Sequence, residues 1–165
     1  MTPFCFEHVF RAPSTAAVLA AYFDEQHQAE QDRATAIAER ELVELEDRDG
    51  ELRRTCRVVP RRRLPALVQP LTHGQFHYIE HVTWRRSEDV IEIDIRPSLL
   101  RGRVQILGTY RLERAADGAI RRTYAGHVSV DIAFVAGRIE RGIIAELGKT
   151  LPLAAACTQD WLDRA

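Results

Sequence analysis

The chain has 165 residues, of which 45% are hydrophobic and 28% are charged. A chain of this length and composition can bury a core of its own, so we expect one domain over residues 1–165. Its 23 basic and 24 acidic residues give a net charge of −1. No overall field therefore favours nucleic acid or an anionic membrane surface, and we expect no nucleic-acid partner.

Targeting and metal signals are absent from the sequence. The first ten residues lack the basic start and apolar run of a secretory signal, and no stretch approaches the ~20 apolar residues of a membrane span. Cys5, Cys56 and Cys157 lack the paired spacing of a zinc or redox motif. We expect a cytoplasmic protein with reduced cysteines, no membrane span, no bound metal and no cofactor.

The first part of the chain predicts a strand followed by two helices. Apolar residues at every second position indicate a strand over residues 3–11. Ser14 or Thr15 can cap a helix whose apolar residues recur at helical spacing as far as Phe23. A second helix, polar along most of its length, is expected over residues 24–33.

A hairpin is predicted next. Residues 34–47 are rich in Ala and Glu, which favours helix, but their branched apolar residues alternate as in a strand. The Asp49-Gly50 turn signal leads into alternating residues 52–58, which is typical of a tight hairpin. We therefore predict two strands here.

The middle of the chain predicts a short helix and four more strands. Helical spacing of leucine and valine indicates a short helix over residues 64–74, inside a connection. The four strands are expected over residues 76–84, 91–95, 104–112 and 124–132, separated by turn signals. Each predicted strand has one apolar face, and an antiparallel sheet of this kind packs that face on another apolar layer.

The last thirty residues supply the layer. Over residues 136–165, apolar side chains fall within one arc of about 160° when residues are placed at helical spacing. Pro152 removes a helical hydrogen bond, and Gly148 has a low helix propensity, which makes the helix more flexible there. We therefore predict a bent helix that is broken between Gly148 and Pro152 and gripped by the sheet.

The order of elements, together with particular motifs, resembles the START-like (SRPBCC, helix-grip) superfamily, which includes birch-allergen-like, lipid-transfer and polyketide-cyclase-like members. The branch it resembles is domain-of-unknown-function family 2505, over nearly the whole chain. The motifs that carry the resemblance are Phe6 to Pro13, Val59-Pro60 with Arg63 to Val68, Glu80 and Trp84, Gly108 to Leu112, Val128 and Val130, Gly137, Ile139 and Glu140, and Trp161-Leu162. These are packing motifs, and no catalytic signature comes with them.

The resemblance implies an α+β fold in which a seven-stranded curved antiparallel sheet surrounds a long C-terminal helix, with two short helices after the first strand. It also implies an elongated cavity between sheet and helix that commonly holds an apolar small molecule. The residues that we expect to line this cavity are Phe76, Tyr78, Glu80, Trp84, Ile91, Ile93, Ile95, Ile106, Tyr110, Val128, Val130, Ile143, Leu147 and Leu151.

Glu80 is the one candidate for catalysis, because it shares the predicted inner face with apolar residues. A buried carboxylate is costly unless it is paired or protonated. One interpretation is a ligand anchor or a general acid. The other is a structural role, either as an ion pair with Arg54, which occupies the inward register of a different strand, or as an exposed carboxylate at the rim of the sheet.

Two other groups invite functional interpretations that we do not favour. His77 and His81 stand four residues apart on a strand, about 13 Å from each other, which is too far for one metal ion. The basic run 61–63 has no interleaved aromatic residues to stack on bases, so a solvated loop is expected there.

The leading functional hypothesis is binding of an apolar lipid-, sterol- or polyketide-like molecule. One alternative is a polyketide cyclase or dehydratase-type enzyme that uses Glu80 with Tyr78 or Tyr110. Another is a protein-interaction module whose interior is filled by side chains. A polar cluster deep in the cavity favours the enzyme, and the lack of a cavity favours the interaction module.

Overall fold

The computed structural model describes residues 1–61, 64, 66 and 68–164 of the chain. The first strand and two helices are β1 (Thr2–Phe10), α1 (Thr15–Phe23) and α2 (Glu25–Ala34). The later elements are β2 (Ile37–Arg48), β3 (Glu51–Pro60), the 3-10 turn η1 (Gln69–Leu71), β4 (Tyr78–Arg85), β5 (Val90–Pro97), the 3-10 turn η2 (Leu100–Gly102), β6 (Val104–Arg114), β7 (Ile120–Val130) and α3 (Ala136–Asp163).

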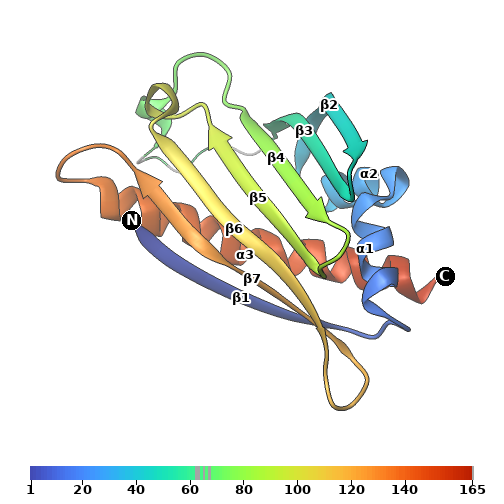
Figure 1. Ribbon diagram of the computed structural model, residues 1–165. Coiled ribbons are helices and arrows are strands. Elements are labelled where there is room, and N and C mark those ends of the chain that lie inside the picture. Colours follow the sequence, from blue (N-terminus) through green and yellow to red (C-terminus); the bar gives the residue numbers. More distant parts are fainter. Residues whose placement is uncertain (62–63, 65, 67, 165) are drawn as a thin grey trace.

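The strands form one seven-stranded antiparallel sheet in the order β1-β7-β6-β5-β4-β3-β2 (Figure 1). Strands β2 to β7 follow one another as a meander, and β1 pairs with β7 at the far edge. The hairpin between β2 and β3 turns through Asp49 and Gly50, which have φ values of 55° and 77°. Positive φ at both central residues is what a tight hairpin turn requires, so the predicted Asp-Gly turn is confirmed.

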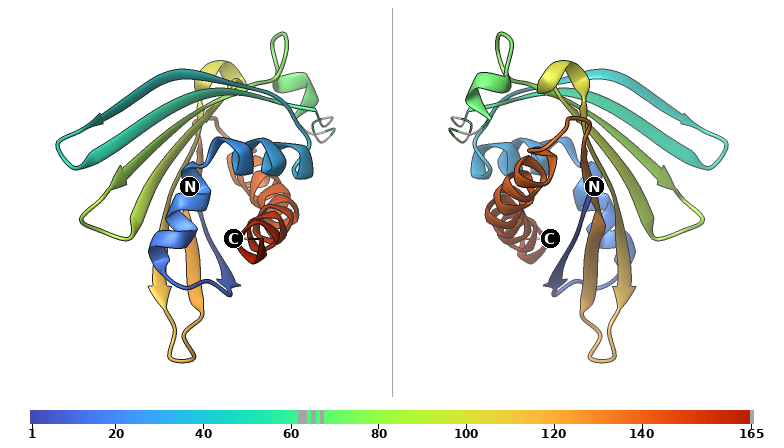
Figure 2. Two further views of the ribbon diagram at one scale, coloured as in Figure 1. Left: turned by 90° about the vertical axis from the view of Figure 1, so that its right-hand side faces the viewer. Right: turned by 90° about the vertical axis from the view of Figure 1, so that its left-hand side faces the viewer.

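Helix α3 lies on the concave side of the curved sheet (Figure 2). It contacts β1 and β7 directly, while α1 and α2 pack beside it and contact β6 and β2 respectively. The side chain of Ser14 caps α1 by accepting a hydrogen bond from the Ala17 amide, and Asp24 caps α2 in the same way through the His27 amide. The sheet thus has one covered face and one open face.

The core on the covered face has two parts. The larger part lies under α1 and the C-terminal half of α3 and includes Phe10, Leu19 and Ile120. The smaller part lies under the N-terminal half of α3 and includes Val104 and Ile139. Residues from β6, β7 and α3 contribute to both parts.

Most of the predicted elements are confirmed, including the strand over residues 34–47, which forms β2 despite its helix-favouring composition. The break predicted in the last helix is wrong, because α3 runs without interruption from Ala136 through Pro152 to Asp163. Pro152 is exposed, so the hydrogen bond that it removes lies on the solvent side of the helix. Packing of the opposite face keeps the helix continuous.

The connection before β4 differs from its prediction. A short helix was expected over residues 64–74, and the described part contains the three-residue turn η1. Positions 65 and 67 of the predicted helix lie outside the described residues, as do Arg62 and Arg63 of the basic run. Phe76, expected in the next strand, precedes the first residue of β4.

Candidate ligand pocket

An apolar pocket of about 240 Å³ lies between the sheet and the N-terminal half of α3. Its lining comes from the sheet, from α3, from the connection before β4, and from the ends of α2 and η2. The residues are Thr35, Ile37, Pro60, Leu64, Val68, Phe76, Tyr78, Ile95, Pro97, Leu99, Ile106, Ile139, Gly142, Ile143, Glu146, Leu147 and Thr150. The resemblance implied a cavity at this place, between sheet and helix.

Strand register and helical spacing explain how these walls form. Ile95 and Ile106 are directly paired on neighbouring strands, so both point to the covered face. On the helix, Ile139, Ile143 and Leu147 recur every four residues and therefore share one face. Gly142 lies beside them, and a Cβ atom added there would meet no heavy atom within 4 Å. The missing side chain of Gly142 leaves part of the pocket open.

The structure divides the predicted cavity residues into two groups. Those that line this pocket are Phe76, Tyr78, Ile95, Ile106, Ile143 and Leu147. Those that do not are Glu80, Trp84, Ile91, Ile93, Tyr110, Val128, Val130 and Leu151. Trp84 stacks on Phe23 with ring centroids 5.1 Å apart, and Tyr110 meets Tyr22 at 5.8 Å, so α1 covers this part of the inner face. The alternation of apolar residues along each strand identified the inner face of the sheet. It did not identify the part of that face that α1 covers.

The polar side chains of the pocket include one hydroxyl that can bind a ligand. The hydroxyls of Thr35 and Thr150 already donate to the carbonyls of Gln31 and Glu146. The Tyr78 hydroxyl makes no such bond to the described residues. Burial, with the nearby Glu80 carboxylate, raises the pKa of Tyr78 well above its usual range. The hydroxyl therefore stays protonated and is available as a hydrogen-bond donor.

Glu80 belongs to an ion-pair network rather than to the pocket lining. Its Oε1 lies 2.9 Å from Nη1 of Arg40, whose Nε lies 2.9 Å from Oδ2 of Asp32. The three side chains are only 14–16% exposed. Glu80 thus forms an ion pair, as one interpretation expected, but the prediction that its partner is Arg54 is wrong. A bulge between Ile37 and Glu39 shifts the alternation of β2, so that Arg40 faces inward.

Two other arginines lie in the interior: Arg54, which was predicted to face inward but with Glu80 as its partner, and Arg122, which was not predicted there. The guanidinium of Arg54 lies 5.2 Å from the ring centre of Phe23, and that of Arg122 lies 4.7 Å from that of Tyr110. In both, Nε and Nη2 are buried and have no hydrogen-bond partner among the described residues. Cation–π contact stabilises these charges. Arg122 lies between Ile120 and Tyr124 in the every-second series of buried residues in β7, and this spacing was the available sequence signal.

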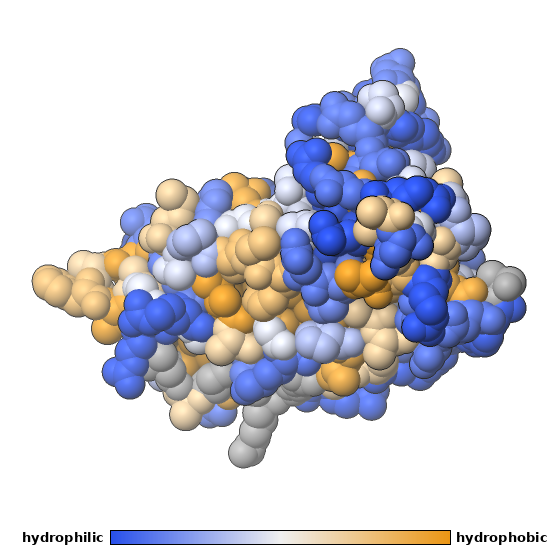
Figure 3. Space-filling model, turned by 90° about the horizontal axis from the view of Figure 1, so that it is seen from below, coloured by the Kyte–Doolittle hydropathy of each residue, from blue (hydrophilic) through white to orange (hydrophobic). Residues whose placement is uncertain are grey.

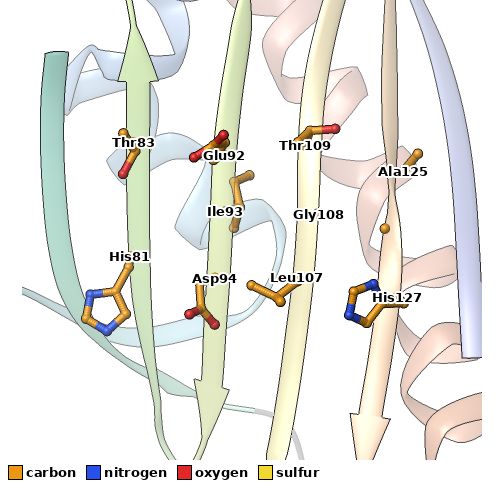
Figure 4. Close-up of a pocket in the computed structure, with 11 residues that line it drawn as sticks. His81, Thr83, Glu92, Ile93, Asp94, Leu107, Gly108, Thr109, Ala125 and His127 are labelled. Atoms are coloured by element: carbon orange, nitrogen blue, oxygen red, sulfur yellow. The ribbon is translucent and has the colours of Figure 1, made fainter. Parts of the chain in front are cut away.

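The open face of the sheet carries a larger and more open depression of about 550 Å³, lined by both polar and apolar residues (Figure 4). His81 and His127 lie on it, on β4 and β7, with β5 and β6 between them. Nδ1 of His81 lies 3.0 Å from the Thr55 hydroxyl. Within the described residues, no group of three or more His, Cys, Asp or Glu side chains is placed to hold a metal ion. The pocket under α3 is the better candidate because it is more enclosed and its lining is more strongly apolar.

A curved antiparallel sheet that grips one long helix, with an apolar pocket between them, defines the START-like (helix-grip) class of proteins. Residues 6–162 match the family described as "Protein of unknown function (DUF2505)", and the chain belongs to that family. The branch indicated by the sequence motifs is therefore confirmed. No curated protein sequence matches the chain.

Solved structures share the fold over nearly the whole chain. The protein TTHA0849 from Thermus thermophilus has a TM-score of 0.64 at 11% identity, covering 97% of this chain and 96% of its own. A START superfamily protein from Mycobacterium smegmatis has a TM-score of 0.61 at 10% identity, covering 99% of both chains. The Zhui aromatase/cyclase from Streptomyces sp. R1128 has a TM-score of 0.60 at 11% identity, covering 98% of this chain and 94% of its own. At these identities the similarity shows the fold alone.

Proposed function

We propose that the protein binds an apolar small molecule, of a lipid-, sterol- or polyketide-like kind, in the pocket between the sheet and α3. The observation that carries this proposal is the pocket itself, whose walls are mostly aliphatic and aromatic side chains. Burial of apolar ligand surface there contributes about 25 cal/mol per Å² before ordering costs. The START and aromatase/cyclase names among the structural neighbours support this class of ligand.

The volume of the pocket and the free hydroxyl of Tyr78 restrict the class of ligand further. Pockets for drug-sized ligands are about 300–1,000 Å³, and this pocket of about 240 Å³ lies below that range. We therefore expect a compact ligand, or one that inserts a single apolar arm. Tyr78 can donate a hydrogen bond to one oxygen of that ligand, such as a carbonyl or an ether.

Extraction of the purified protein tests this proposal. Protein from an expression host is extracted with organic solvent, the extract is analysed by mass spectrometry, and thermal unfolding is then followed with added fatty acids, sterols and polyketides. We expect a bound apolar compound, or an increase in Tm with one of these classes, because a ligand that binds only the folded state stabilises it. No extracted compound together with no Tm increase for any class would contradict the proposal.

Tyr78→Phe tests the polar contact. It removes only the hydroxyl, so it should weaken binding of an oxygen-containing ligand by about 0.5–1.5 kcal/mol and leave binding of a pure hydrocarbon unchanged. Equal weakening for both ligands would contradict a role for the hydroxyl. Calorimetric titration of the two ligands measures the difference.

The enzyme alternative would require Glu80 to exchange protons with a bound substrate. Its carboxylate contacts Arg40 and does not line the pocket, so we prefer binding without chemistry. The interaction-module alternative requires a filled interior, and the pocket argues against it.

A further inference from the structure

The loop between β7 and α3 holds a phenylalanine completely out of the protein. Phe134 has a relative exposure of 106%, and its neighbour Val135 is 44% exposed. Phe134 is the apex of a tight turn that the Val135 amide closes by donating to the Ala133 carbonyl at 2.9 Å. Its φ of 69° is a conformation that residues with side chains seldom adopt. Local sterics and core packing therefore do not explain the position of this ring.

Exposed arginines surround the same loop. Arg101 lies in η2 and Arg103 between η2 and β6, and Arg138 and Arg141 lie in the first two turns of α3. None of these four side chains forms an ion pair or hydrogen bond with another described residue. Exposed Asp131 is the acidic residue of the loop. The chain as a whole has a net charge of −1, so positive charge is concentrated at this end.

Backbone contacts hold these segments together. The Asp131 amide donates to the Arg103 carbonyl at 2.9 Å, which ties the loop to the β5–β6 connection. The N-terminus of α3 adds positive potential, because no described side chain caps it and its first turn contains no acidic residue. Figure 3 shows hydrophobic side chains projecting at its left-hand end, where Figure 1 places this loop, with hydrophilic side chains beside them.

We propose that this end of the molecule docks on a bilayer that contains anionic phospholipid, with Phe134 inserted among the lipids and the arginines on the headgroups. Aromatic rings and basic side chains together are typical of the membrane interface. A stable protein partner needs a broad complementary surface, whereas this loop presents one projecting ring. The proposed contact is peripheral, through a loop. Among the described helices, none is long and apolar enough to cross a membrane.

The docking end adjoins the pocket. Leu99, next to η2, and Ile139 and Ile143, in the first turns of α3, all line the pocket. Docking would therefore bring the pocket near the lipid surface. The inference does not depend on pocket occupancy, because its test measures vesicle association.

Flotation of the full chain with lipid vesicles tests the inference. We expect binding to vesicles of phosphatidylcholine mixed with phosphatidylglycerol, much weaker binding to phosphatidylcholine alone, and loss of binding as salt is raised. Phe134→Ser should weaken binding at least about tenfold. The double variant Arg138→Gln/Arg141→Gln should weaken it about 25-fold, at about fivefold per charge.

Matched controls come from exposed residues elsewhere. Arg111→Gln/Arg121→Gln removes the same charge from the β6–β7 hairpin, and Val9→Ser removes an exposed apolar side chain from β1. Both controls should bind vesicles as the original protein does. Absence of binding to anionic vesicles at low salt, which is the result expected of a site for an acidic protein, would overturn the inference. So would equal binding by Phe134→Ser, or an equal loss in the arginine control.

Discussion

At the residue scale, Arg40 connects three parts of the fold. It lies on β2 and binds Asp32 of α2 and Glu80 of β4, with all three side chains mostly buried. Buried carboxylates that lose a paired cation are left uncompensated, and such changes are more costly than the ion pair itself is stabilising. Arg40 therefore matters more for stability than the exposed arginines do.

Arg40→Met should lower the free energy of unfolding by about 2–4 kcal/mol, because it leaves Asp32 and Glu80 without their partner. Denaturant unfolding measures the loss. Arg111→Met, at an exposed position without an ion pair to any described residue, serves as the control and should change stability by less than about 0.5 kcal/mol. A loss below about 1 kcal/mol for Arg40→Met would contradict this role.

Glu140 is another buried carboxylate and gives the protein a pH dependence. Burial opposes its ionisation, but hydrogen bonds from the Thr2 hydroxyl, the Met1 amino group and the Val130 amide outweigh it, and the pKa of Glu140 is lowered. A carboxylate whose pKa is lower in the folded state stabilises fully above its unfolded pKa. That contribution is lost as the pH falls through the folded pKa.

Glu140→Gln should therefore lower the free energy of unfolding by about 1–3 kcal/mol at neutral pH, and the difference should shrink below about pH 4. Urea unfolding at a series of pH values measures it. Exposed Glu113→Gln provides the matched control, with little change at any pH. A difference that stayed constant down to acidic pH would show that ionisation of Glu140 is not involved.

At the scale of elements, α3 forms one wall of the pocket and stays continuous through a proline. Pro152 is exposed, while the neighbouring Leu151 is only 7% exposed and packs in the core. The helix thus tolerates the missing hydrogen bond on its solvent side because its other side is buried.

Pro152→Ala should raise the free energy of unfolding by about 1–3 kcal/mol, because alanine restores an amide donor to the Gly148 carbonyl and has the highest helix propensity. Thermal unfolding measures the change as an increase in Tm. An unchanged or lower Tm would mean that the proline sets a helix curvature needed for packing against the sheet.

At the scale of the whole molecule, local patterns predicted the fold well. Alternating strands and one long apolar stripe imply a one-sided sheet covered by a helix, and that arrangement is present. The family motifs indicated the START-like fold, and solved structures share this fold, including one of a START superfamily protein.

The site was less predictable, because it depends on contacts between elements. The packing of α1 over Trp84 and Tyr110 decides which inner-face residues line the pocket, and no pattern within one strand reports it. The partner of Glu80 depends on a bulge in β2. The net charge of −1 gave no indication of the arginines around Phe134. Arg101 and Arg103 are distant in sequence from Arg138 and Arg141, and only the fold brings the two pairs together.

Gly142 allows the central claim, ligand binding in the pocket under α3, to be tested most directly. Gly142→Leu places a side chain into open pocket space, and Ala145→Leu adds the same side chain at an exposed position of the same helix. Leucine favours helix over glycine and is nearly equal to alanine, so both proteins should fold.

The measurement is a fluorescence titration with the apolar probe N-phenylnaphthylamine. We predict saturable binding by the original chain and by Ala145→Leu, and binding at least about tenfold weaker by Gly142→Leu, because the added side chain occupies the ligand's space. Equal probe affinity for Gly142→Leu and the original chain would contradict the proposal that this pocket is the binding site.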